Sequence, residues 1–443
     1  MLSIEVKNRI NQLNPWVSHP EKAENLIARF IPQEYVLREV EKTSVRSNRA
    51  LLVVGPRQSG KSTMIWHLLR RFSPDILFLS MEDPLLRIGC IYPIDFVGYL
   101  QENYQFIKVI FIDEIQHMED AGLFVKGLVD SKLNLPILVT GSSSFDLRSK
   151  TRESLAGRAT RRLLMPFNVM ELMRHANPPN PMAARNICQQ IVSHQLIFGS
   201  FPSIYLSVKH DEKIMFLSDL VEALILRDAS DLFKIKRVDA FRKLLTLLAG
   251  QIGSLVNHSE LASICNVDVG TINAYIEILE ESHVVKRLRP FAGGKRREIT
   301  GAAKVFFIDN GIRNQLLNNF SNELDLRTDK GELLENWVFT EIYKTLPLQS
   351  SLKFWRSKTK AEVDFVIEHA GKTYALEVKF ASLKGAKMSR SAWSFIEAYE
   401  PEKFAVLNMT FEEPVILKKA EIDFITPYSL PQWLDSIFKI PDP

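Results

Sequence analysis

Residues 51–63 read LLVVGPRQSGKST, in which a β-branched run is followed by a glycine-rich loop. The residues after the loop have helical character, so the segment reads as strand, loop and helix. Gly55 and Gly60 permit backbone angles and a close approach that a Cβ would prevent. Successive loop amides can then point inward at the amino end of the helix and bind an anion. This context predicts a phosphate-binding P-loop.

The polar residues of this loop have distinct expected tasks. Lys61 can reach the β- and γ-phosphates of a nucleoside triphosphate, and the Ser62 hydroxyl can hold Mg²⁺. Thr63 lies one residue too late to be the metal ligand. The predicted nucleotide-binding residues are Gly55, Pro56, Arg57, Gln58, Ser59, Gly60, Lys61, Ser62 and Thr63.

A pair of acids completes this prediction further along the chain. The apolar run VIFI, residues 109–112, is followed at once by Asp113 and Glu114. Asp113 can accept hydrogen bonds from Mg²⁺-bound water and from Ser62, and Glu114 can polarise the attacking water as a general base. Two acids after a strand also occur at solvated loop ends, but the preceding P-loop favours the catalytic interpretation.

A third buried strand is predicted at residues 137–140, and a serine-rich turn follows it. Alternating strand and helix patterns over residues 46–170 indicate a parallel α/β sheet that gathers these strand ends. Thr140 or Ser142 could touch the γ-phosphate or the attacking water. Ser142 is the preferred candidate, and a plain turn is the alternative.

Arg158 follows Gly157 near a predicted helix end. It could act as an arginine finger on the nucleotide of an adjacent subunit, which would require an oligomer such as a hexamer. Arg161 and Arg162 are near alternatives, and a solvated basic face would explain all three arginines equally well.

Five segments occur in a suggestive order: GPRQSGKST, VIFIDEIQ, TGSSS, ESLAGR and PFNVMEL. Together they resemble the prokaryotic AAA-like ATPases whose C-terminal half carries a domain of unknown function, and the resemblance covers most of the chain. It implies an ATPase that uses ATP and Mg²⁺. The GSFP segment, residues 199–202, is similar to a G-x-P element that sets a helical lid against the nucleotide base in relatives. Pro202 would then lie near adenine, and a helix-breaking turn is the alternative.

The predicted fold is an α/β P-loop NTPase (AAA-like) core with a helical lid, a winged helix and a C-terminal PD-(D/E)xK-like α/β domain. The expected regions are a helical lead-in at 1–45, the ATPase core at 46–170, the lid at 171–235, the winged helix at 236–315 and the nuclease-like domain at 316–443.

The winged helix is predicted from three helical segments followed by two strands with a basic tip between them. Its basic residues could contact nucleic-acid phosphates, in which case binding would fall steeply with salt. These residues are Lys286, Arg287, Arg289, Lys295, Arg296, Arg297 and Lys304. The expected recognition helix is acidic, however, with Glu277, Glu280 and Glu281, so a role in subunit contact is the alternative.

The C-terminal region contains two acids and a lysine on predicted strands, Asp364 and Glu377-x-Lys379, and a further acid, Glu335, on a predicted helix. This spacing resembles the PD-(D/E)xK nuclease core, in which carboxylates hold Mg²⁺ and a lysine orients water. Val363 stands where the motif's proline would be. A solvated amphipathic strand is the alternative, and nuclease-like folds often lose activity, so cleavage stays open.

The composition excludes fewer possible functions than the motifs do. The net charge of +4 permits nucleic-acid binding without indicating it, and the three cysteines show no metal-binding spacing. The first residues do not resemble a signal peptide and no apolar run suits a membrane span, so a cytoplasmic protein is expected. The leading hypothesis is ATP hydrolysis that drives a conformational change or movement on DNA, including branched DNA. The alternatives are a signalling or scaffold ATPase and, less well supported, a small-molecule kinase.

Overall fold

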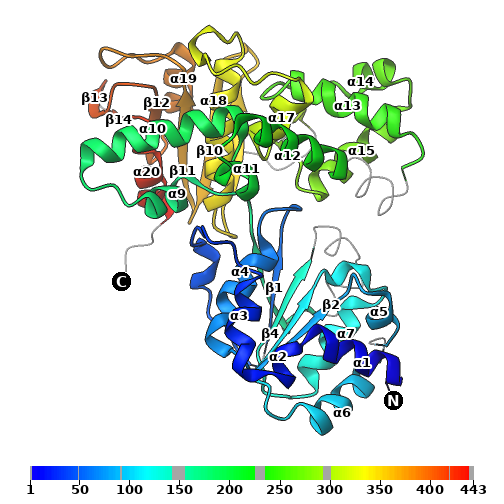
Figure 1. Cartoon of the computed structure of the whole chain (residues 1–443). Helices are drawn as coiled ribbons and strands as arrows, with labels where there is room; N and C mark the ends of the chain where they lie inside the picture. Colours follow the sequence, from blue (N-terminus) through cyan, green and yellow to red (C-terminus); the bar gives the residue numbers. More distant parts are fainter. Residues whose placement is uncertain are drawn as a thin grey trace. The chain divides into compact units, whose positions relative to one another are not determined.

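The computed structural model describes residues 2–47, 49–89, 92–141, 155–224, 235–292, 301–418 and 420–438. The chain forms two compact units (Figure 1). Unit 1 comprises Met1–Pro166 together with Glu281–His283, and unit 2 comprises Phe167–Glu280 and Val284–Pro443. Each unit is described by itself.

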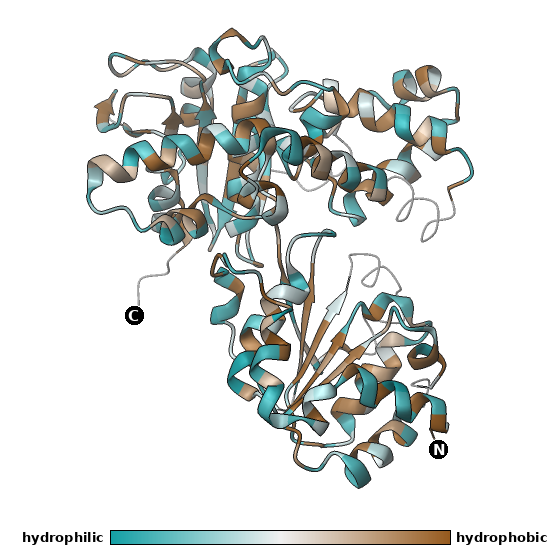
Figure 2. Ribbon diagram, in the orientation of Figure 1, coloured by the Kyte–Doolittle hydropathy of each residue, from teal (hydrophilic) through white to brown (hydrophobic). Residues whose placement is uncertain are grey.

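Unit 1 is built on a parallel sheet with the strand order β2-β3-β4-β1-β5. Its strands are β1 (Ala50–Val54), β2 (Ile76–Ser80), β3 (Val109–Asp113), β4 (Ile137–Gly141) and β5 (Ala159–Leu163). The connecting helices include α4 (Lys61–Leu69), α5 (Pro84–Gly89), α6 (Pro93–Asn103) and α7 (Ala121–Asp130). Leu51 and Val53 pack into one core and Leu52 and Val54 into another, so both faces of the sheet are covered. The strands of this sheet are accordingly apolar along their length (Figure 2).

The lead-in is part of unit 1. It forms α1 (Ile4–Leu13), α2 (Pro15–Ser18) and α3 (Ala23–Ala28). The Asn14 side chain accepts a hydrogen bond from the Phe78 amide at 2.6 Å and donates to the Phe78 carbonyl at 2.9 Å. Trp16 Nε1 donates to the Ile76 carbonyl at 2.8 Å. These contacts satisfy backbone groups of the edge strand β2, which would otherwise be open to pairing.

The first part of unit 2 is helical. Its helices are α9 (Val169–Ala176), α10 (Pro181–Phe198), α11 (Pro202–Leu206), α12 (His210–Ala223), α13 (Val238–Gly250), α14 (His258–Cys265), α15 (Val269–Glu281) and α17 (Asn310–Leu316). Strands β6 (Val285–Leu288) and β8 (Lys304–Phe307) form an antiparallel pair after α15. The buried Asn314 of α17 donates to the carbonyls of Leu196 and Ile197 at the end of α10, so these helices form one packed body.

The second part of unit 2 is a seven-stranded mixed sheet with the order β13-β14-β12-β11-β10-β9-β7. The strands are β7 (Pro290–Phe291), β9 (Ser351–Arg356), β10 (Glu362–His369), β11 (Lys372–Val378), β12 (Lys403–Leu407), β13 (Glu413–Leu417) and β14 (Ala420–Ile425). Helices α18 (Lys330–Thr345) and α19 (Arg390–Tyr399) pack on this sheet, and α20 (Leu430–Phe438) ends the described chain. No helix among the described residues has the length and apolar character needed to cross a membrane.

Strand β10 contains a β-bulge next to one of the predicted nuclease residues. The pairing register of β10 against β9 shifts between Val363 and Val366. Both valines enter the same core although they are three residues apart, which alternation along a regular strand would not allow. Such bulges redirect a side chain, and here the affected residues include Asp364.

Candidate functional site

The P-loop connects β1 to α4 as the sequence predicts. Gly60 has φ +89° and precedes the first helical residue, Lys61. A Cβ on Gly55 would lie 2.1 Å from the Leu164 carbonyl oxygen, so only glycine fits where the loop leaves the sheet. The glycine-rich loop therefore leads directly into the amino end of a helix, where backbone amides can bind phosphate groups.

Lys61 lies folded along this loop. Its ammonium donates to the carbonyl oxygens of Gly55 at 3.2 Å and Pro56 at 2.9 Å, and the residue is buried. The flexible lysine stem allows the ammonium to turn from these carbonyls toward a phosphate bound in the loop.

Three polar side chains meet where β3 and β4 end next to the P-loop. Ser62 Oγ donates to Asp113 Oδ1 at 2.8 Å, and Thr140 Oγ1 also donates to Asp113. Burial raises the pKa of Asp113, although the hydrogen bonds from Thr140 and Ser62 oppose that rise. A hydroxyl paired with a carboxylate offers the oxygen ligands that Mg²⁺ prefers, so the donor set fits this cation.

Glu114 adopts a left-handed backbone conformation with φ +52° directly after β3. Its amide donates to Thr140 Oγ1 at 3.1 Å, and its carboxylate accepts from Gln116. A non-glycine residue in this conformation often marks a functional position. Glu82, Glu114 and His117 present ligand atoms within 4.8 Å of one another, and Glu82 follows the neighbouring strand β2.

Ser142, the preferred candidate at the end of β4, lies outside the described residues. Thr140, the other candidate, contacts both Asp113 and the Glu114 amide. The pattern at residues 137–140 named Thr140, but only the strand register shows that its side chain lies beside the two acids.

Arg158 lies at the amino ends of the strands, opposite to the end that carries the P-loop. Its carbonyl accepts from the amide of Ala50, the first residue of β1, whereas the P-loop follows the last residue of that strand. Its guanidinium pairs with Asp130 at 2.7 Å. Arg162 donates to Thr43, and Arg161 lies on the same strand. Arg158 therefore cannot serve the nucleotide of its own P-loop, and its predicted action on an adjacent subunit stays a prediction.

The lead-in contributes a residue that sequence reasoning missed. Arg38 is buried and donates to the carbonyls of Ser59 in the P-loop, at 3.0 Å, and of Met165, at 2.5 Å. Its amide donates to Glu41, whose carboxylate also bonds His67 of α4. No motif signals these residues, because the contacts form between segments that are far apart in sequence.

The GSFP segment belongs to unit 2. Gly199 has φ +78°, and a Cβ there would lie 1.8 Å from Asp309. The Ser200 amide and hydroxyl both donate to Asp309, at 2.7 and 3.1 Å. Pro202 begins α11. The structure thus gives the segment a packing role around Asp309, and contact between Pro202 and adenine stays a prediction.

The four predicted nuclease residues lie on α18, β10 and the end of β11. Asp364 accepts from the Val378 amide at 2.7 Å. Lys379 lies 3.6 Å from Glu377, which also accepts from Ser389. Glu335 bonds Lys304 at 3.2 Å. Burial raises the pKa of Glu335 and of Asp364.

The prediction that Lys304 could contact phosphates is wrong. Its side chain is only 3 % exposed, and its ammonium lies 2.6 Å from Glu362 and 3.2 Å from Glu335. The sequence groups Lys304 with the basic residues of the winged helix, whereas β8 lies against α18 and directs this side chain toward the acids.

Of the other predicted phosphate contacts, Lys295, Arg296 and Arg297 lie outside the described residues. Arg287 is engaged with Glu280 at 2.6 Å. Arg289 and Arg287 line a hollow of about 640 Å³ together with His258, at the amino end of α14.

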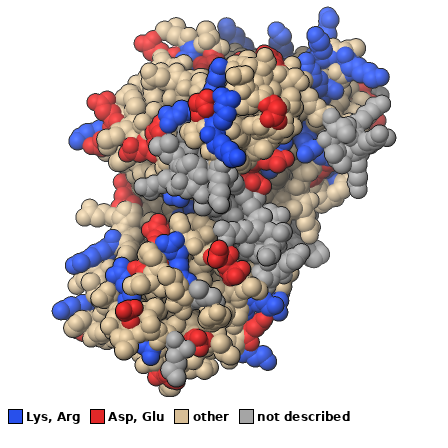
Figure 3. Space-filling view, turned by 90° about the vertical axis from the view of Figure 1, so that its right-hand side faces the viewer, with Lys and Arg blue, Asp and Glu red and all other residues tan. Residues whose placement is uncertain are grey.

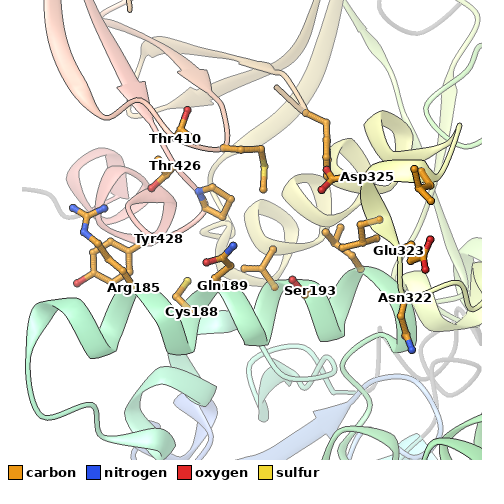
Figure 4. A pocket seen from close by; sticks show the side chains of 17 residues that line it. Arg185, Cys188, Gln189, Ser193, Asn322, Glu323, Asp325, Thr410, Thr426 and Tyr428 are labelled. Carbon is orange, nitrogen blue, oxygen red and sulfur yellow. The ribbon is translucent and has the colours of Figure 1, made fainter. Parts of the chain in front are cut away.

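A second cavity, of about 740 Å³, lies between α10 and the ends of strands in the C-terminal sheet (Figure 4). Arg185 on its wall is held by Glu412 at 2.6 Å and lies over the Tyr428 ring. Glu323 and Asp325 add two carboxylates. The charged lining is therefore more acidic than basic, which does not suit a phosphate-bearing ligand.

Comparison with known proteins agrees with the geometry of unit 1. Residues 47–173 match a family described as AAA domain. Residues 189–323 and 330–430 match two families described as domains of unknown function, DUF8612 and DUF4143. The first match and the arrangement of the P-loop against the two acids show an α/β P-loop NTPase core of the AAA type.

The chain is also similar to several proteins that are described as uncharacterized. One from Methanocaldococcus jannaschii is 24% identical over 330 residues, which are 72% of each chain. One from Mycobacterium tuberculosis is 25% identical over 382 residues, 84% of this chain and 80% of the relative. One from Haemophilus influenzae is 25% identical over 74% of this chain and 82% of the relative.

Solved structures give only low similarity. The replication initiator DnaA bound to AMPPCP and single-stranded DNA has a TM-score of 0.27 at 14% identity, covering 57% of this chain and 92% of that one. AMPPCP-bound DnaA from Aquifex aeolicus has a TM-score of 0.26 at 12% identity, covering 63% and 93%.

Proposed function

We propose that this chain hydrolyses ATP and uses the resulting conformational change to act on DNA. The observation that carries the ATPase proposal is the contact network of Ser62, Asp113, Thr140 and Glu114 beside the P-loop. Such a constellation supplies the positioning and charge stabilisation on which phosphoryl transfer depends.

Each residue of the network has a role in this proposal. Ser62 and Asp113 would hold Mg²⁺, which when bound neutralises charge on the phosphate oxygens. Lys61 would bind the β- and γ-phosphates, and Thr140 keeps Asp113 and the Glu114 amide in place. Glu114 would accept the proton of the attacking water. Arg158, at the opposite end of the strands from the P-loop, would act across a subunit boundary in an oligomer such as a hexamer.

The first test removes the phosphate-binding lysine. Lys61→Ala should abolish ATP hydrolysis and weaken nucleotide binding, because it removes the ammonium that would bind the β- and γ-phosphates. Calorimetry with a non-hydrolysable ATP analogue and a phosphate-release assay measure the two effects. Lys22→Ala, at an exposed lysine in the lead-in, is the matched control. Phosphate release that survives Lys61→Ala would contradict the proposal.

The proposed DNA contact rests on unit 2. Helices α13, α14 and α15 followed by the β6–β8 pair have the element order of a winged helix. The hollow lined by His258 and Arg289 also includes Gly301, Ala302 and Ala303, which follow the predicted wing segment in sequence. On the face of unit 2 shown in Figure 3, lysine and arginine side chains gather near the upper edge. The C-terminal sheet, with its PD-(D/E)xK-like residues, would hold the nucleic acid next to this region.

A salt series tests the DNA contact. If phosphate contacts dominate, the logarithm of the binding constant should fall linearly with the logarithm of salt concentration. Arg289→Ala should reduce the slope by about 0.9. Arg242→Ala, which removes an arginine already paired with Glu222, should leave the slope unchanged.

A DNA-binding constant that does not change with salt concentration would instead support a second function. This function is a signalling or scaffold ATPase whose unit 2 mediates assembly. One observation favours this alternative: Glu280 of α15 already engages Arg287 and Lys286, at 2.6 and 3.5 Å. Two of the basic residues expected at the DNA would then have an internal partner.

A further inference from the structure

The C-terminal acidic cluster consists of Glu335, Glu362, Asp364 and Glu377. A nuclease of the PD-(D/E)xK type would need these carboxylates to hold a divalent cation. Whether they fit such a cation depends on how closely they converge and on which cations already lie among them.

Lys304 already lies among these acids. Its ammonium contacts Glu335 and Glu362 and lies over the Phe354 ring, 5.4 Å from the ring centre. Burial would lower the pKa of Lys304, but the charges of Glu335, Asp364 and Glu362 outweigh burial and raise it. The lysine is therefore held as a cation.

The backbone fixes Lys304 in this position. It pairs with Leu288 in the β6–β8 ladder and forms a bridge with Leu255 on its other side. Gly253, with φ +69°, brings the preceding turn within 3.3 Å of the Glu335 carboxylate, as measured from an added Cβ. A side chain at this position would crowd Glu335, so the turn and the lysine enclose this acid together.

Three of the four acids in the cluster already have a basic partner. Glu362 also pairs with Arg356 at 3.2 Å, and Glu377 lies next to Lys379. The Asp364 carboxylate accepts a hydrogen bond from the Val378 amide at 2.7 Å. Among the described residues, the group of three ligating side chains within 4.8 Å of one another is Glu82, Glu114 and His117, so Glu335, Asp364 and Glu377 do not converge in that way.

We propose that the Lys304 ammonium takes the place that a divalent cation would need in this cluster, so that the C-terminal domain does not cleave phosphodiesters by a metal-dependent mechanism. A divalent ion beside the buried lysine would be repelled by its positive charge. Displacing the ammonium from Glu335 and Glu362 would break two buried ion pairs, which is also unfavourable. The donor set therefore does not fit the ion that the nuclease comparison implies. This inference is independent of ATP hydrolysis in unit 1.

Binding of Mn²⁺ tests the proposal. The parent chain for this test carries Asp113→Asn, which disables the expected metal position in unit 1, and every further variant is made in it. Titration calorimetry measures the binding of Mn²⁺. The parent chain should show no Mn²⁺ uptake that depends on Asp364. Lys304→Ala should gain one Mn²⁺ site, binding at least about tenfold tighter than any uptake by the parent. Adding Glu335→Gln should remove that site again.

Lys353→Ala is the matched control, because it removes a lysine on the same sheet that pairs with Glu368 outside the cluster. It should not create a Mn²⁺ site. Stoichiometric uptake by the parent chain that disappears with Asp364→Asn would overturn the proposal, and so would a folded Lys304→Ala chain that gains no site. If Lys304→Ala does not fold, as judged by circular dichroism, the parent chain and its Asp364→Asn variant decide alone. Their rates of plasmid nicking in Mn²⁺ should be equal, and a faster rate in the parent would refute the inference.

Discussion

Glu114→Gln should bind ATP normally but hydrolyse it at least about a hundredfold more slowly than the wild-type chain. The amide is nearly the same size as the carboxylate, so the hydrogen bond from the Glu114 backbone to Thr140 and the loop after β3 should persist. What the variant loses is a base that can take a proton from water. Phosphate release under single-turnover conditions, together with calorimetry using a non-hydrolysable analogue, separates turnover from binding.

A suitable control is Glu102→Gln, which makes the same chemical change at an exposed position on α6. It should turn over like the wild type. Normal hydrolysis by Glu114→Gln would remove Glu114 as the base, and Glu82, which lies within 4.8 Å of it, would then be the next residue to substitute.

The α/β core of unit 1 could be predicted because its signals are local. A β-branched run, a glycine-rich loop and an apolar strand ending in two acids each lie within a few residues, and parallel strands bring such ends to one edge. The positions of Arg38 and Asn14 could not be predicted. Arg38 bonds the P-loop at Ser59, 21 positions further along the chain, and Asn14 bonds Phe78, 64 positions further along.

For the C-terminal acids too, local features could be predicted from the sequence and contacts between distant segments could not. Alternation along the strand predicted which face Glu377 and Lys379 share, but the bulge between Val363 and Val366 changes the direction of Asp364. Lys304 was grouped with the basic residues of the wing because neighbours in sequence were assumed to share an environment. Packing of β8 against α18 pairs it instead with Glu335 and Glu362.

Asp329→Asn should destabilise unit 2 by about 3 kcal/mol, because it leaves two buried arginines without a counter-charge. The side chains of Arg313 and Arg327 are 4 % and 2 % exposed, and both bond the Asp329 carboxylate. Urea unfolding followed by circular dichroism should show one transition move to lower urea. Asp325→Asn, at an exposed aspartate in the same connection, should leave the curve unchanged.

The same carboxylate should make the stability of unit 2 depend on pH. Burial alone would raise the pKa of Asp329, but hydrogen bonds from Arg327 and Arg313 lower it from 3.8 to about 2. Because the folded-state pKa lies below the unfolded one, the ionised group stabilises the fold above pH 3.8, and this contribution is lost as the pH falls toward 2. The contribution at neutral pH is about 2 kcal/mol. Asp329→Asn should therefore lose less stability than the wild type across this acid range, and equal slopes would show that Asp329 is not paired with the arginines in solution.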